Sequence, residues 1–143
     1  MVRTLAELLA EAEARVTRFT PQEAYTAMAD GALLVDLRSQ PARDRDGIVP
    51  GSLHIPRTVL EWRVALDSDW RSPFVGGPDE QIVLLCDDGY SSLLAAETLA
   101  GLGFARVGDV LGGFAAWKDA GLTTTRPRAQ PVGVLPGMSG PEF

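Results

Sequence analysis

The stretch QIVLLCDDGYSSLLAAETL, from Gln81 to Leu99, decides the fold of this chain. Its first six residues form an apolar run typical of a strand buried on both faces, and the residues from 92 onward have the pattern of a helix. Cys86, the only cysteine, lies where the strand ends and a tight turn begins. This position aims the sulfur at backbone N–H groups of the turn and at the positive end of the helix, which suits a thiolate or a persulfide.

Apolar runs elsewhere in the chain predict the remaining strands, and helical spacing predicts the helices between them. The expected strands are residues 32–36, 53–55, 81–86 and, with a weaker pattern, 106–110. The expected helices in this part of the chain are residues 58–66, 92–100 and 114–119. Strands that alternate with helices predict an α/β domain with a parallel sheet.

Two helix-start signals come before these elements. Thr4 and Glu7 have the spacing of a capping box, and apolar residues recur at helical spacing behind them. Thr20 followed by Pro21 predicts a second helix start, because threonine caps well and proline fits the first helical position. We therefore expect residues 1–19 to form an N-terminal helical extension.

The composition limits what the chain can do. Its 143 residues can bury one core and form one domain. A net charge of −6 argues against nucleic acid or an anionic membrane as partner. There is no signal-peptide pattern, and no apolar stretch is long enough to span a bilayer. A lone cysteine precludes an internal disulfide and a multi-cysteine metal site, so we expect a cytoplasmic protein with no metal or cofactor.

Four short motifs follow one another across residues 20–122. They are VDLR at 35–38, DGIVPGSLHIP at 46–56, the cysteine stretch at 82–92 and LGGFAAWKDAGL at 111–122. In this order they resemble the single-domain rhodaneses, sulfurtransferases whose nucleophilic cysteine follows a central strand. The resemblance implies a rhodanese-like domain over 20–122, with a central parallel sheet of about five strands and helices on both faces. The cysteine loop would lie at the carboxyl end of a strand. Residues 123–143, rich in Pro and Gly, are expected to be a disordered tail.

The resemblance also implies a function. Cys86 would take a sulfane sulfur from a small-molecule donor or a persulfidated protein, become a persulfide, and pass the sulfur to a thiol or cyanide. The loop that would surround the sulfur consists of Asp87, Asp88, Gly89, Tyr90, Ser91 and Ser92. Gly89 would let the backbone turn closely around the sulfur, a serine hydroxyl would donate a hydrogen bond to it, and Tyr90 would form a pocket wall.

The loop departs from the common pattern Cys-x-x-Gly-x-Arg-Ser, whose arginine holds an anionic donor, because Ser91 stands at the arginine position. Asp87 and Asp88 add negative charges that repel thiosulfate and oppose ionisation of the thiol. Two charges roughly 6 Å apart interact by about 0.7–3 kcal/mol at an effective dielectric of ~20–80. The helix end offers only about 0.3–2 kcal/mol in return. We therefore predict poor use of thiosulfate.

Three arginines are candidates for binding the donor and for offsetting the loop acids: Arg38, Arg57 and Arg63. For Asp36 and Arg38 a structural role is the favoured interpretation, in which the carboxylate at the strand end accepts loop N–H bonds and Arg38 pairs with a nearby acid. The missing loop arginine also leaves a second interpretation open, a weak or inactive rhodanese-like module for binding or redox sensing. A cysteine phosphatase needs a longer loop that ends in arginine, whereas seven residues from Cys86 end at Ser92.

Overall fold

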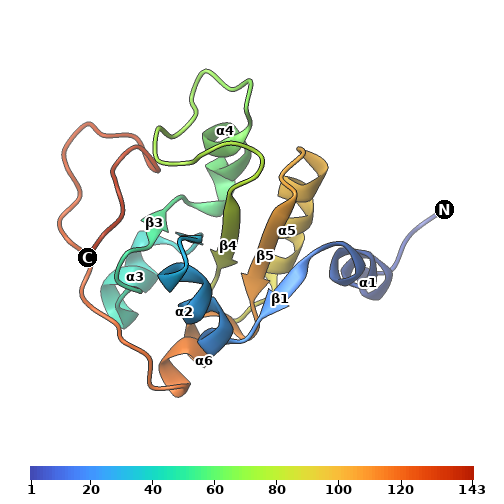
Figure 1. Cartoon of the computed structure of the whole chain (residues 1–143), viewed down its shortest axis with the longest axis horizontal. Helices are drawn as coiled ribbons and strands as arrows, with labels where there is room; N and C mark the ends of the chain where they lie inside the picture. The colour runs from blue at the N-terminus through green and yellow to red at the C-terminus, as the bar shows by residue number, and fades with distance from the viewer.

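The computed structural model describes residues 1–143 and has five parallel strands in one sheet, in the order β1-β5-β4-β2-β3 (Figure 1). The strands are Thr17–Phe19 (β1), Leu33–Asp36 (β2), Leu53–His54 (β3), Gln81–Leu85 (β4) and Arg106–Val110 (β5). The helices are Leu5–Arg15 (α1), Pro21–Ala29 (α2), Gln40–Asp46 (α3), Leu60–Val64 (α4), Ser91–Gly101 (α5) and Gly113–Asp119 (α6), with a 3₁₀ turn at Arg57–Val59 (η1).

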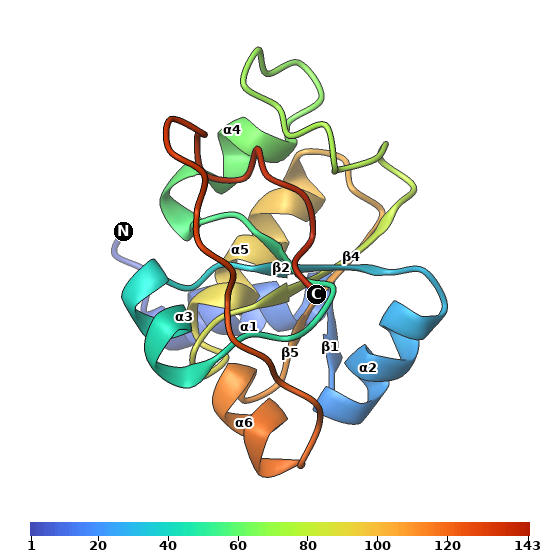
Figure 2. The same ribbon diagram turned by 90° about the vertical axis from the view of Figure 1, so that its left-hand side faces the viewer.

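The sheet separates two apolar cores, as expected for parallel strands buried on both faces. Along β4, Ile82 and Leu84 pack into the core that α4 and α5 cover, whereas Val83 and Leu85 pack into the core of α2 and α6. Figure 2 shows these pairs of helices on opposite sides of the sheet. The predicted α/β fold with helices on both faces is confirmed, and none of the helices combines the length and apolar character needed to cross a membrane.

Two elements were not predicted, β1 and α3. The three residues of β1 are too few to show a pattern, and they form a strand because they pair in parallel with β5. The helix α3 has a polar sequence, QPARDRD, and begins where the Ser39 side chain accepts a hydrogen bond from the N–H of Ala42. Both elements prove important, because they bring charged residues to the carboxyl edge of the sheet.

The helix α1 begins at the predicted capping box, in which Thr4 and Glu7 exchange hydrogen bonds, and α2 begins at an equivalent box with Thr20 as its N-cap. The helix α1 packs against α5, and β1 joins the sheet directly after it. Residues 1–19 therefore contribute a strand as well as the expected helix.

The structure differs from our expectation of a disordered tail at residues 123–143. Thr125 forms an antiparallel bridge with Ile48, and Glu142 forms another with Ser52. The Glu142 side chain is buried and pairs with Arg43. The prolines and glycines of the tail disfavour helices and strands, but they do not prevent isolated contacts of this kind. The ion pair between Glu142 and Arg43 helps to hold the tail along the α3 and β3 side of the domain (Figure 2).

Candidate active site

Cys86 directly follows the last residue of β4 and therefore lies at the carboxyl edge of the sheet. Its Sγ accepts a hydrogen bond of 3.1 Å from the backbone N–H of Gly89 and donates one of 3.3 Å to Ser92 Oγ. Cys86 is 6% exposed, and the two hydrogen-bond partners of its sulfur are polar groups of the loop. The predicted arrangement, a thiol held by a main-chain amide at a strand-to-helix turn, is therefore present.

The direction of one hydrogen bond differs from the expected one. We expected a serine hydroxyl to donate to the sulfur, but the hydroxyl of Ser92 donates to Asp109 Oδ2 at 2.7 Å. Because a hydroxyl has a single proton, Ser92 accepts from the thiol and does not donate to it. Ser92 is fully buried, whereas Ser91 is exposed at the start of α5.

The Gly-Gly motif at the start of α6 holds the cysteine loop from the other side. The N–H of Phe114 donates to the carbonyl of Cys86 at 2.8 Å, and the N–H of Ala115 donates to the carbonyl of Asp87 at 3.1 Å. Gly113 has φ +60°, and a Cβ there would lie 2.5 Å from the carbonyl oxygen of Cys86. Only glycine allows this approach, which explains in physical terms why the motif accompanies the cysteine loop.

A buried ion pair lies behind the loop. Asp109 of β5 is fully buried, and Arg18 of β1 binds it with two hydrogen bonds of 3.0 Å. Arg18 Nη2 also donates to the carbonyl of Gly89 at 2.7 Å. The hydrogen bonds to Asp109 raise the pKa of Arg18; burial acts in the opposite direction, and the negative charges of Asp109 and Glu13 raise it further. Arg18 is thus a permanent cation in electrostatic contact with the thiol.

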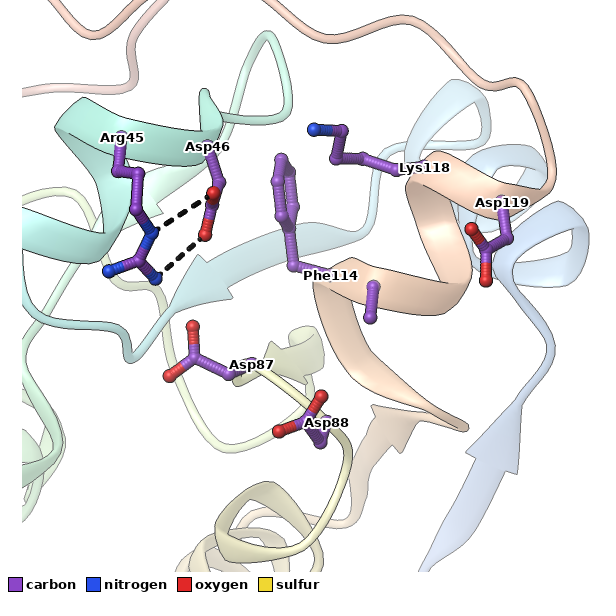
Figure 3. A pocket seen from close by; sticks show the side chains of 8 residues that line it. Arg45, Asp46, Asp87, Asp88, Phe114, Lys118 and Asp119 are labelled. Atoms are coloured by element: carbon purple, nitrogen blue, oxygen red, sulfur yellow. Dashed lines mark hydrogen bonds and ion pairs between the residues drawn. The ribbon is translucent and has the colours of Figure 1, made fainter.

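An open hollow of about 550 Å³ lies beside the loop (Figure 3). Its charged lining residues are Arg45, Asp46, Asp87, Asp88, Lys118 and Asp119, and Phe114 and Ala115 complete it. In Figure 3 the two loop acids face α3 and α6, which carry the other charges. The charges of the lining residues are four negative and two positive, so an anionic donor meets a net negative surface.

Neighbouring charges in the hollow partly neutralise one another. Arg45 donates two hydrogen bonds to Asp46, which lower the pKa of that carboxyl, and these bonds together with the charges of Asp46 and Asp87 raise the pKa of Arg45. Asp88 has no hydrogen bond or ion pair with a cation. The loop acids predicted to repel anions are therefore exposed beside the cysteine, with Asp87 partly offset by Arg45.

The three arginines that we considered for donor binding have other partners. Arg38 is buried in an ion pair with Asp36 and lies 3.8 Å from the centre of the Phe114 ring, so the structural interpretation of this residue is the one its contacts favour. Arg57 pairs with Glu61 along η1 and α4. Arg63 is buried and donates to the carbonyls of Trp70 and Pro136. None of the three contacts the cysteine loop through a hydrogen bond or an ion pair.

Tyr90, expected as a pocket wall, is 76% exposed and does not line the hollow. Gly89 has φ +87°, and a Cβ there would lie 2.7 Å from the backbone nitrogen of Gly112, so its predicted role in a tight turn agrees with the geometry. His54 Nε2 donates a hydrogen bond to the carbonyl of Arg38, 2.7 Å away, and has no hydrogen bond to the cysteine loop.

Sequence reasoning missed the residues behind the loop, Arg18 and Asp109. One signal was available, since an aspartate inside the otherwise uncharged strand segment at 107–110 is unusual unless it has a buried partner. The partner itself could not be inferred, because Arg18 and Asp109 meet only through the register of the unpredicted strand β1.

The fold and the site define a class of protein, an α/β domain with a thiol held by backbone at the end of a central parallel strand. The sequence model of the rhodanese-like domain matches residues 20–120. The chain belongs to the rhodanese-like domain family.

Several relatives carry names that describe sulfur chemistry. A protein of Pseudomonas syringae pv. syringae named thiosulfate sulfurtransferase GlpE is 35% identical over 103 residues, which are 71% of this chain and 86% of that protein. A sulfurtransferase of Allochromatium vinosum is 31% identical over 101 residues, 71% of this chain and 85% of that protein.

Solved structures show the same fold. A Rhodopseudomonas palustris protein of unknown function, described as a possible tyrosine phosphatase, has a TM-score of 0.79 at 31% identity and covers 87% of this chain and 96% of its own. A polysulfide-sulfur transferase homodimer from Wolinella succinogenes has a TM-score of 0.68 at 23% identity, and the match covers 87% of this chain and 88% of that one. At this lower identity the likeness concerns the fold alone.

Proposed function

We propose that this chain is a sulfurtransferase that carries a sulfane sulfur as a persulfide on Cys86. The observation that carries the proposal is the hydrogen bond from the N–H of Gly89 to Sγ at the start of α5, because this donor can stabilise a negatively charged sulfur. Sulfurtransferase relatives at 31–35% identity support the same reaction class.

The reaction has two balanced steps. In the first, the thiolate of Cys86 attacks the outer sulfur of the donor, so that an Sγ–S bond forms while the S–S bond of the donor breaks. The donor fragment leaves with the electron pair, as sulfite from thiosulfate or as a thiolate from a persulfide. In the second, an acceptor thiolate or cyanide attacks the terminal sulfur, and Cys86 leaves as a thiolate. The cycle requires no further oxidant or reductant.

The charges around the hollow favour a donor other than thiosulfate. Asp87 and Asp88 stand beside the cysteine, and Ser91 occupies the position at which a loop arginine holds an anionic donor. A zwitterionic or cationic low-molecular-weight persulfide, or a persulfide on a basic partner protein, avoids this repulsion. The names of the relatives point to thiosulfate, so donor choice is where this chain is expected to differ from them.

The second candidate function is a redox-sensing or binding module with little turnover. The low exposure of Cys86 favours it, because a large donor cannot reach the sulfur without movement of the loop. Phosphate-ester hydrolysis has less support, since the loop from Cys86 to Ser92 contains no arginine to bind a phosphate.

The test is intact mass spectrometry after incubation with cysteine persulfide, glutathione persulfide or thiosulfate. We expect one added sulfur atom, removed by dithiothreitol and absent from Cys86→Ser. No uptake from any donor would favour the binding module, and equal uptake by Cys86→Ser would refute the proposal.

Donor choice is tested by the rates of uptake in an Asp87→Asn/Asp88→Asn variant. We expect its rate with thiosulfate to rise by about threefold or more, as the Coulomb energy of a nearby charge pair implies, with a smaller change for zwitterionic cysteine persulfide. The matched control is Asp67→Asn/Asp69→Asn, which removes two exposed acids from the loop before β4. Rapid thiosulfate uptake by the unchanged protein would overturn this part of the proposal.

A further inference from the structure

The cysteine loop lacks a cation of its own, yet a guanidinium lies directly behind it. Arg18 comes from β1, before the first residue that the family model matches. Its Nη2 binds the carbonyl of Gly89, the same residue whose N–H binds Cys86 Sγ. Arg18 therefore holds the peptide segment that supplies the hydrogen bond to the sulfur.

Arg18 also neutralises a charge that would otherwise oppose a thiolate. Asp109 is fully buried and binds the hydroxyl of Ser92, which in turn contacts the sulfur. An unpaired carboxylate at this position would be costly and would repel a negative sulfur. Arg18 donates to both carboxylate oxygens of Asp109, from Nε to Oδ1 and from Nη2 to Oδ2, and Oδ2 is also the oxygen that accepts from Ser92.

Other charged groups near the thiol do not take this role. They are Asp87 and Asp88 in the loop, Arg45 and Asp46 on α3, Lys118 and Asp119 on α6, and Glu13 on α1. Glu13 lies 3.9 Å from Arg18 and is largely exposed, so its negative charge offsets the field of the guanidinium only through a solvent-screened contact. Arg45 and Lys118 face the open hollow.

We propose that Arg18 is the positioning residue of the cysteine loop: it aims the Gly89 N–H at Cys86 and offsets the charge of buried Asp109. This role deepens the proposed function and rests on it for its biological meaning. The anionic forms of Cys86, thiolate and persulfide, are the states that Arg18 stabilises. The segment 1–19 thereby belongs to the working site and is more than an appendage.

The experiment measures the pH dependence of Cys86 alkylation by iodoacetamide, a neutral reagent. Removing Arg18 alone would leave Asp109 buried and unpaired, which threatens folding. The comparison is therefore made on an Asp109→Asn background, between Asp109→Asn and Arg18→Gln/Asp109→Asn. Any change in the hydrogen bonding of the Ser92 hydroxyl is common to both variants, so the difference between them isolates Arg18.

We expect the midpoint of the pH–rate profile to move upward by about half to two pH units when Arg18 is removed, which is what Coulomb's law gives for a unit charge at a nominal separation of ~6 Å and an effective dielectric of ~20–80. Arg18→Lys on the same background keeps the charge and should restore part of the shift. Arg15→Gln, which removes an exposed arginine of α1 that pairs with Glu97, is the matched control and should leave the midpoint unchanged.

Identical midpoints in the two Asp109→Asn variants would overturn the proposal, since a merely structural arginine lowers stability without moving the profile of the folded protein. A shift as large for Arg15→Gln would do the same. Alkylation needs no sulfur donor, so a shifted midpoint without sulfur uptake would keep this role for Arg18 and reject the proposed function. Sulfur uptake with an unshifted midpoint would do the reverse.

Discussion

Two buried clusters of arginine and acid lie at the carboxyl ends of the strands, and they serve different purposes. In the first, Asp36 binds Arg38 and Arg43, and Arg43 also binds Glu142 of the tail. In the second, Asp109 binds Arg18 and the hydroxyl of Ser92. Each cluster balances its buried charges, so both satisfy the same electrostatic requirement.

The difference lies in the group that each cluster contacts next. The Asp36 cluster is closed by the tail, and the side chains of Asp36, Arg38 and Arg43 have no exposure. The Asp109 cluster opens onto the cysteine loop, and the Arg18 side chain is 21% exposed. Ion pairing in itself therefore does not mark a functional site; its contact with a reactive group does.

The largest expected effect separates the two clusters directly. Asp36→Asn removes the negative charge that pairs with two buried arginines, Arg38 and Arg43. Breaking a buried ion pair in this way should lower the free energy of unfolding by about 3–5 kcal/mol. Urea unfolding measures it. The control, Asp46→Asn at the exposed pair with Arg45, should leave the urea midpoint unchanged. If the folded fraction of Asp36→Asn also lost its normal alkylation profile, the clusters would not be independent.

A substitution at the Gly-Gly motif tests the loop side of the comparison. Gly113→Ala places a Cβ 2.5 Å from the carbonyl of Cys86, whereas Gly121→Ala, at φ +73°, meets no neighbouring atom. Both substitutions place a side chain on a residue with a left-handed backbone conformation. Gly113→Ala should lower the free energy of unfolding by about 1–3 kcal/mol more than Gly121→Ala, because its Cβ is crowded. It should also slow sulfur uptake by about tenfold or more, because crowding at the carbonyl of Cys86 displaces the loop that holds the sulfur. Equal stability of the two variants would contradict the close packing of the loop against α6.

The tail offers a smaller test of the closed cluster. Glu142→Gln keeps an oxygen for Arg43 but removes the charge, and we expect a loss of about 1–2 kcal/mol by denaturant unfolding. Limited proteolysis should then cut within residues 126–141 faster than in the unchanged protein. If stability and cleavage were both unaltered, the result would favour the disordered tail that we expected from its composition.

The smallest effect depends on pH. Burial, and then the charge of Arg43, lowers the pKa of His54 below its ordinary value, so His54 is neutral in the fold and takes up a proton more readily when unfolded. Unfolding free energy should therefore fall as the pH drops below about 6.5, by at most about 1.4 kcal/mol per pH unit for one proton. His54→Gln should remove this part of the pH dependence. A profile identical to that of the unchanged protein would contradict the burial of the imidazole.

The sequence sufficed for the elements whose local pattern is strong. β4, α5 and the capped helices follow from apolar runs and N-cap residues, and the thiol at the strand end followed from the position of Cys86. The three-residue strand β1 and the polar helix α3 carry no such pattern, because tertiary pairing creates them. Arg18 could not be assigned for the same reason, since its partner Asp109 is 91 positions away and their register is set by the sheet.

The central claim concerns turnover at Cys86, and counting thiocyanate tests it most directly. With cysteine persulfide as donor and cyanide as acceptor, the account predicts many equivalents of enzyme-dependent thiocyanate for each protein molecule, and none above the uncatalysed background for Cys86→Ser. At most one equivalent for each molecule, or the same yield from Cys86→Ser, would contradict it.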